Sequence, residues 1–225
     1  MNQCPWHSFA PSRGLFDVCE QEICHWVAQP GNTWTNIGFL VTAYLIFKAT
    51  KGKREFIDRV FIFMSAGLFI GSTAFHMTVT RVGQVMDLAA IYFLSAALIT
   101  FGLKRLYSLN KDGTFWLYMT LLVVPLAHMI LADTSGIRVL AALFTVSLII
   151  EFILWKKAIT KNVKPFIQAL LIFLLGFSLW VLDIRGILCD PNNHILSAHG
   201  VWHILCAIAV YQLYYFFKSE LKSEA

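Results

Sequence analysis

The last apolar run of the sequence begins with Ser197-Ala198-His199-Gly200-Val201-Trp202-His203. Residues four apart on a helix differ by about 40° in rotation and about 6 Å in height, so His199 and His203 lie on one face. Two imidazoles in this arrangement bind a single metal ion, and zinc normally takes a third protein ligand. The candidate for that ligand is His76, which ends the run Gly71-Ser72-Thr73-Ala74-Phe75-His76. The spacing therefore predicts a metal site built from two segments that are far apart in the sequence.

The composition places these segments in a membrane. The chain has 225 residues, of which 58% are hydrophobic and 14% are charged, and its mean hydropathy is +0.66. A helix needs about 20 mostly apolar residues to cross a bilayer, and seven stretches meet this requirement, roughly 32–48, 58–80, 85–103, 114–132, 137–155, 165–184 and 197–217. The connections between them are short and polar. We therefore expect an all-α membrane protein, a single seven-transmembrane helix bundle over residues 1–225 with an outer N-terminal segment over 1–31.

The basic residues are distributed unevenly between the two ends of the predicted bundle. The gaps after the first, third and fifth stretches and the C-terminal tail, together with Lys48 and Arg59 at the ends of the flanking stretches, hold 14 of the 18 Lys and Arg residues. The positive-inside rule then places the C-terminus in the cytoplasm and the N-terminus outside. The net charge of +5 does not indicate nucleic-acid binding, because the lysines are scattered over loops. The first 30 residues lack an apolar core region, so we expect no cleaved signal peptide.

This topology brings five polar side chains to a similar depth near the outer side: Ser72, His76, Asp87, His199 and His203. Each has a simpler explanation when it is taken alone. A histidine in a membrane helix often hydrogen-bonds to a neighbouring helix, and a serine can bond to a carbonyl of its own preceding turn. An aspartate at membrane depth is harder to explain without a function. Their common depth favours a shared metal site.

The N-terminal segment is acidic, with Asp17, Glu20 and Glu22 within six positions. This pattern fits either a solvated turn at the interface or a site for a hard cation such as calcium, and it lacks the regular spacing of an EF-hand loop. We expect Glu151 to be a surface acid and Asp183 to pair with Arg185 at the outer interface.

Cys19 and Cys189 both fall in outer segments, where an oxidising compartment would allow them to form a bridge. Cys4 or Cys24 could compete for either partner, and the spacing does not decide the connectivity. Cys206 lies within the last stretch and is expected to be a packed thiol.

The metal-site residues resemble the signature of the membrane hydrolase superfamily that includes the alkaline ceramidases and adiponectin-receptor-like proteins, and the alkaline ceramidases are the nearer match. The resemblance extends over nearly the whole chain and rests on these motifs: Ser72-x3-His76, Phe75-His76-Met77-Thr78, Gln84-x2-Asp87, Leu174-Leu175-Gly176-Phe177, His199-x3-His203, Trp202-His203-Ile204-Leu205, Asp17-x-Cys19-Glu20 and Asn32-Thr33-x-x-Asn36.

The resemblance implies zinc bound by His76, His199 and His203, with Ser72 and Asp87 as catalytic partners. It also implies a bridge between Cys19 and Cys189, and a calcium site formed by Asp17, the carbonyl of Val18, Glu20, Glu22 and Gln29. The sequence departs from the family at Val18, where a Trp is usual, and at Leu88, where an acid is common. The family also has an amide at the position of Glu22 and an acid at the position of Gln29, so the number of carboxylates is the same. The segment before Asn32 is also two residues shorter.

These observations lead to the hypothesis of a zinc-dependent intramembrane hydrolase that cleaves the amide bond of ceramide or a related N-acyl lipid. Asp87 would act as the proton acceptor and Ser72 would stabilise the oxyanion. Two alternatives remain at this stage: a receptor-like lipid binder with structural zinc, and a hydrolase of another lipid acyl bond. The expected partner is a membrane lipid, and the expected location is a bacterial inner membrane or an ER or Golgi membrane, with the site on the outer or lumenal side. The oligomeric state is unknown.

Overall fold

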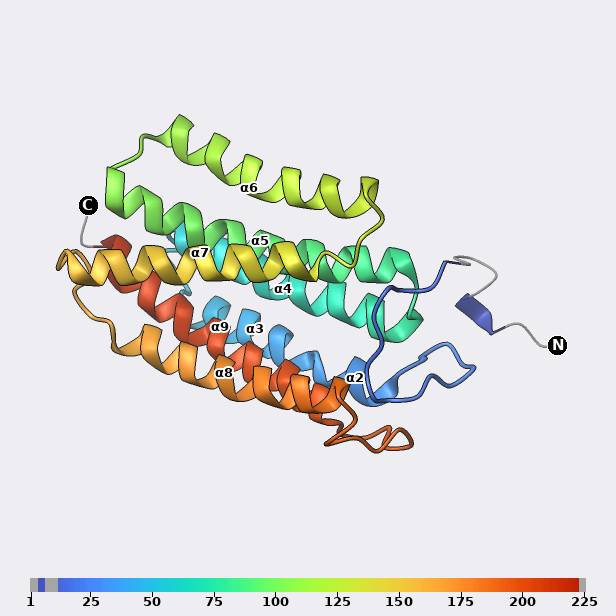
Figure 1. Ribbon diagram of the computed structural model, residues 1–225. Coiled ribbons are helices and arrows are strands. Elements are labelled where there is room, and N and C mark those ends of the chain that lie inside the picture. The colour runs from blue at the N-terminus through green and yellow to red at the C-terminus, as the bar shows by residue number, and fades with distance from the viewer. Residues whose placement is uncertain (1–3, 7–11, 223–225) are drawn as a thin grey trace.

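Long helices run side by side along one axis in the computed structural model, which describes residues 4–6 and 12–222 (Figure 1). In chain order the helices are α2 (Pro30–Thr35), α3 (Ile37–Ala49), α4 (Phe56–Thr78), α5 (Arg81–Tyr107), α6 (Lys111–Leu131), α7 (Ile137–Lys156), α8 (Lys164–Ile184) and α9 (Ala198–Lys222). The described residues contain no strand, only an isolated bridge between Arg13 and Thr80. The structure thus confirms the all-α class.

Six of these helices, α4 to α9, are long and apolar enough to cross a membrane. The first predicted span is shorter, because it is divided into α2 and α3 at Asn36. The backbone of Asn36 is itself helical, with φ −62° and ψ −16°, so residues 30–49 form one nearly continuous helical stretch. Pro30 starts this stretch at the first helical position, where a missing N–H costs nothing.

The third predicted span, 85–103, proves too short at both ends. At its N-terminal end the Thr80 hydroxyl accepts a hydrogen bond from the Gly83 amide at 3.2 Å and caps α5. At the other end the helix continues because Arg105 is buried in an ion-pair network with Glu151 and Glu220, at 3.0 Å and 2.8 Å. The expectation of Glu151 as a surface acid was therefore wrong, since its carboxylate joins α7 to α5.

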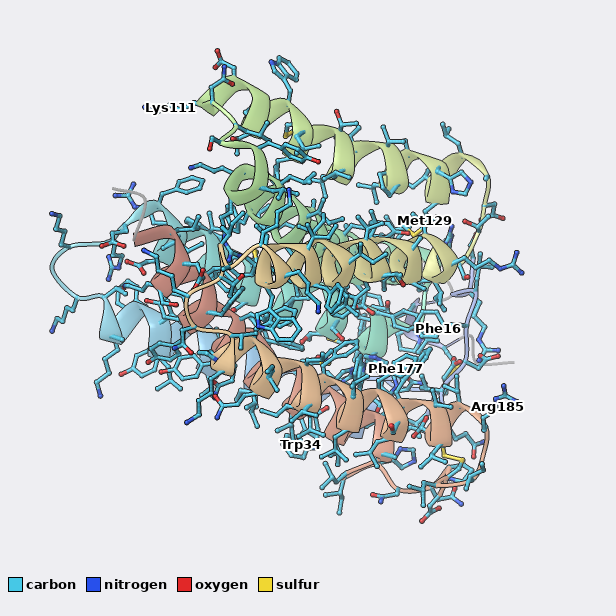
Figure 2. All side chains as sticks on the ribbon, turned by 60° about the vertical axis from the view of Figure 1, so that its left-hand side comes forward. Phe16, Trp34, Lys111, Met129, Phe177 and Arg185 are labelled. Atoms are coloured by element: carbon cyan, nitrogen blue, oxygen red, sulfur yellow. A yellow bond between two sulfur atoms is a disulfide. The ribbon has the colours of Figure 1, made fainter. Side chains whose placement is uncertain are left out.

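The N-terminal segment and the connection between α8 and α9 lie together at one end of the bundle, and the C-terminus lies at the other (Figure 1). Lys111, which begins α6, and Arg185, which follows α8, mark these opposite ends (Figure 2). The outward faces of α6 and α8 carry exposed large apolar side chains, as helices facing lipid do. Trp34 likewise lies at the periphery of the bundle (Figure 2), half-exposed beside the outer loops.

α4 and α5 approach each other closely at Gly71, which places their polar residues side by side. A Cβ atom on Gly71 would lie 2.5 Å from the Met86 carbonyl oxygen and 3.1 Å from the Asp87 Cα atom. The next residue of α4 is Ser72, so the missing side chain of Gly71 allows Ser72 and Asp87 to lie close together.

We expect Gly71→Ala to destabilise the protein by about 1–3 kcal/mol and to lower activity, because backbone must shift to admit the methyl group. Gly67→Ala in the same helix is the matched control, since no atom lies within 4 Å of its added Cβ. That variant should keep wild-type activity and gain about 0.5–1 kcal/mol. Thermal unfolding in detergent measures both, and equal stability of the two variants would contradict the close approach at Gly71.

Candidate metal centre

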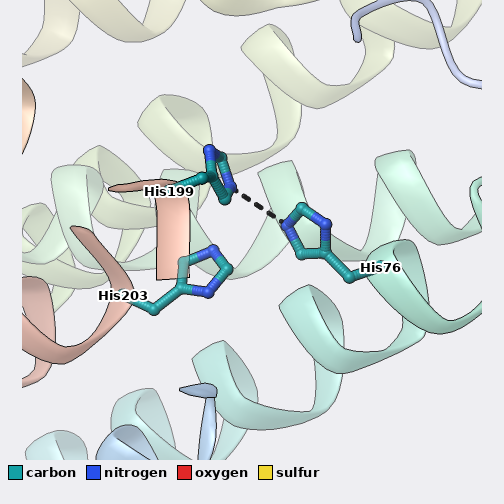
Figure 3. Close-up of side chains that lie close together, drawn as sticks. All are labelled: His76, His199 and His203. Carbon is teal, nitrogen blue, oxygen red and sulfur yellow. Dashed lines mark hydrogen bonds between the residues drawn. The ribbon is translucent and has the colours of Figure 1, made fainter. Parts of the chain in front are cut away.

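Three buried histidines meet at the end of the bundle that holds the N-terminal segment. His76 comes from the last turn of α4, and His199 and His203 come from the first turns of α9 (Figure 3). Their ligand nitrogens lie within 4.8 Å of one another, and no other group of three or more His, Cys, Asp or Glu side chains within the described residues does so. Segments separated by more than 100 residues therefore form one imidazole cluster.

Hydrogen bonds to the far ring nitrogens orient two of these histidines. The Nδ1 atom of His76 lies 2.7 Å from Gln29 Oε1, and the Nδ1 atom of His203 lies 3.0 Å from Thr35 Oγ1. The Thr35 hydroxyl donates its own hydrogen to backbone carbonyls of α2, so it accepts from His203. Both rings then carry their proton on Nδ1 and leave the Nε2 lone pair free. This is the arrangement that metal-binding histidines normally have.

The spacing of the free nitrogens fits zinc. His76 Nε2 and His199 Nε2 are 3.2 Å apart (Figure 3). Two nitrogens bound to a tetrahedral zinc at about 2.0–2.1 Å are about 3.3–3.4 Å apart. The Nδ1 atom of His199 has no hydrogen-bond partner within the described residues, so without an ion His199 can carry its proton on Nε2 and donate it to His76. The donor set of three imidazoles also matches catalytic zinc sites, which leave the fourth position open.

Thr35→Val should lower zinc affinity about 10- to 100-fold, because the isosteric side chain cannot accept the Nδ1 proton of His203. Thr42→Val is the matched control: it removes a hydroxyl that hydrogen-bonds from α3 to the Ala207 carbonyl of α9, away from the histidines. Competition with a fluorescent zinc chelator measures both affinities. If the two variants bound zinc equally well, Thr35 would have no role in orienting His203.

Asp87 and Ser72 lie beside this cluster without joining it. Both are buried, and the side chain of Ser72 lies near the Asp87 carboxylate. Asp87 is not one of the residues whose ligand atoms lie within 4.8 Å of each other. The structure thus separates a group of possible metal ligands from a neighbouring pair that is suited to proton transfer and hydrogen bonding.

Asp183 at the end of α8 holds the start of α9 in place, a role that the sequence did not indicate. Its carboxylate accepts hydrogen bonds from the backbone amides of Cys19, at 2.8 Å, and His199, at 3.1 Å. The expected pairing with Arg185 is therefore wrong, because unsatisfied amides of the N-terminal segment and of the first turn of α9 take both oxygens. Asp183 joins a candidate metal ligand to the outer segment.

Two disulfides fasten the outer segment. One joins Cys19 to Cys189, the pair that the family resemblance implies, and the other joins Cys4 to Cys24. Cys206 is a free thiol, as expected. The first bridge ties the N-terminal segment to the connection between α8 and α9.

The five residues of the predicted calcium site line one open depression, together with Arg13. The side chains of Asp17 and Glu22 both pair with the Arg13 guanidinium, and Asp17 is largely exposed. A cation of the protein itself therefore neutralises two of the three predicted carboxylates.

Two more of the predicted calcium ligands, Glu20 and Gln29, are engaged in hydrogen bonds. The Glu20 carboxylate accepts from the Gly31 and Asn32 amides, at 2.8 Å each, and lies 3.0 Å from His194 Nδ1. The Gln29 oxygen is bonded to His76, and its amide nitrogen donates to the Glu20 carbonyl. Calcium at this depression remains a prediction from the resemblance alone.

Comparison with known proteins identifies the family of this chain. A family model described as ceramidase matches residues 11–223. The chain belongs to the ceramidase family. It is 26% identical over 215 residues to alkaline ceramidase 1 of Mus musculus, an alignment that covers 89% of this chain and 77% of that protein.

Other members of the ceramidase family show the same extended similarity. Alkaline ceramidase 3 of Mus musculus is 26% identical over 229 residues, covering 90% of this chain and 82% of that protein. Alkaline ceramidase YPC1 of Saccharomyces cerevisiae is 23% identical over 232 residues, covering 87% and 72%. Family membership confirms the resemblance seen in the sequence and makes the chain a hydrolase.

Proposed function

We propose that this member of the ceramidase family is a zinc-dependent intramembrane hydrolase that cleaves the amide bond of ceramide, or of a related N-acyl lipid, to a free fatty acid and an amine. The observation that carries the proposal is the cluster of His76, His199 and His203 beside Asp87 at the outer end of an apolar bundle. The family model and the names of the relatives supply the reaction class. They also favour a hydrolase over a receptor-like lipid binder.

The three histidines would hold the zinc ion through their Nε2 atoms. Zinc bound in this way supplies Lewis acidity, which activates water and polarises the amide carbonyl. Asp87 accepts a proton from the water that attacks the carbonyl carbon, and it returns that proton to the amine nitrogen as the C–N bond breaks. Ser72 donates a hydrogen bond to the oxygen on which negative charge develops.

The same proposal includes the membrane topology. Residues 30–49, which contain α2 and α3, would make a seventh crossing in addition to the six helices of sufficient length. The excess of Lys and Arg at the opposite end of the bundle supports a cytoplasmic C-terminus and an outer N-terminus. The histidines would then lie toward the outer or lumenal side, where the two disulfides of the outer segment are stable.

Release of fatty acid from a labelled ceramide by purified protein tests the function. The assay is run beside a chelator-treated sample and a chelator-treated sample with zinc restored. We expect release by the untreated and the restored enzyme only. An ester-linked analogue and an N-acyl amino acid, tested in parallel, define the range of acyl bonds. No release of fatty acid from any of these lipids, with about one zinc per chain still bound, would refute the proposed hydrolysis.

A further inference from the structure

Asn36, between α2 and α3, carries a buried hydrogen-bond acceptor that the fold does not use. The residue is fully buried. Its Nδ2 atom donates to the Asn32 carbonyl at 2.9 Å and to the Thr33 carbonyl at 3.4 Å, which fixes the orientation of the amide, since only the NH2 group can donate. The Oδ1 atom then has no hydrogen-bond partner within the described part of the chain. A buried acceptor without a donor destabilises a fold, so its presence calls for an explanation.

The helix geometry shows which way Asn36 faces. One stripe of α2 and α3 faces α9: Thr35 contacts His203, Gly38 lies against Ala207, and Thr42 bonds to the Ala207 carbonyl. The residues that immediately precede this stripe are exposed: Trp34, Ile37 and Val41. The residues that immediately follow it are buried: Asn36, Phe39 and Ala43. Successive residues differ by about 100° in rotation. Because α4 is the other helix that packs on α3, Asn36 faces α4.

The depth of Asn36 matches that of the candidate active site. Its neighbour Thr35 bonds directly to His203, whose ring lies 4.9 Å from the ring of His76. Asn36 is about 1.5 Å further along the helix than Thr35, and Ser72 is about 6 Å deeper along α4 than His76. Asn36 therefore lies between the levels of the histidines and of Ser72, on the side of α4.

We propose that Asn36 is a substrate-binding residue whose Oδ1 atom accepts a hydrogen bond from the polar head of the lipid. The inference rests on the proposed function, which brings an N-acyl lipid to this depth. Such a lipid offers two kinds of donor near the scissile bond, the amide N–H and the hydroxyl groups of the amine portion. A site with a buried acceptor of this kind rejects analogues that lack the matching donor.

Binding, measured without turnover, tests the proposal. Energy transfer from the protein's tryptophans to a dansyl-labelled ceramide is recorded with chelator-treated protein in nanodiscs. The parent lipid is compared with an N-methyl analogue and with an analogue whose hydroxyls are methylated. We expect Asn36→Leu to weaken binding of the parent lipid about tenfold. One of the two analogues should bind the wild-type protein more weakly than the parent lipid does, by a similar factor. Asn36→Leu should bind that analogue and the parent lipid with equal affinity.

The analogue that shows this non-additivity identifies the donor. Additive losses for both analogues, or an unchanged affinity of Asn36→Leu for the parent lipid, would overturn the proposal and leave Asn36 as a residue that binds buried water. Asn36→Ser, whose hydroxyl is too short to reach the same position, repeats the test if the leucine variant does not fold. Thr42→Val controls for the loss of a hydrogen bond between α3 and α9. Because the assay needs no hydrolysis, its outcome is independent of whether ceramide is cleaved.

Discussion

His203→Ala is expected to abolish both zinc binding and fatty-acid release. Loss of a hydrogen bond to a metal-binding histidine lowers affinity or activity about 10- to 100-fold, so loss of the ligand itself should cost more than 100-fold. Only His76 and His199 would remain, and two imidazoles do not complete a zinc site. Elemental analysis of the purified protein gives the zinc content, and the labelled ceramide assay gives the activity.

His128→Ala is the matched control, because His128 is an exposed histidine of α6 outside the cluster. It should keep about one zinc per chain and full activity. His203→Gln, which is closer to histidine in size, separates loss of the ligand from a packing defect and should also lack zinc. A His203→Ala protein that retained full zinc and activity would disprove the assignment of the metal site.

Much of this site could be predicted from the sequence because its main signals are local. The spacing of His199 and His203 fixes their common face on any helix. The depth of His76 follows from the direction in which its span crosses the membrane, which charge asymmetry and span order indicate. The seven apolar stretches likewise fixed the all-α class, although one of them is interrupted at Asn36.

The residues that orient the metal ligands could not be predicted in the same way. The family resemblance implies a calcium ligand at Gln29 and does not indicate that its side-chain oxygen bonds to His76. Thr35 and Asp183 look like ordinary helix-end residues, and their partners lie up to 168 residues away. Glu151 was placed at the surface because the sequence does not show that Arg105 and Glu220 converge on it. Such contacts depend on how the helices pack, and no spacing rule records them.

Asp87→Asn should lower turnover about 10²- to 10⁴-fold while zinc remains bound. The amide has nearly the same shape as the carboxylate and can still hydrogen-bond to Ser72, but it cannot accept a proton from water. Asp87 lies outside the group of histidine ligands, so metal affinity should not depend on it. The measurement pairs zinc content with single-turnover release of fatty acid.

Measuring zinc content together with turnover distinguishes a role of Asp87 in proton transfer from a role in supporting the metal site, which activity alone would not distinguish. Asp112→Asn, at an exposed position in the first turn of α6, controls for the loss of one negative charge and should be fully active. If Asp87→Asn lost zinc together with activity, Asp87 would support the metal site rather than transfer protons. If it retained full turnover, the proton acceptor would have to be sought elsewhere. Loss of turnover with zinc retained is expected, because Asp87 is buried near Ser72, one turn of α4 from His76, but lies outside the ligand set.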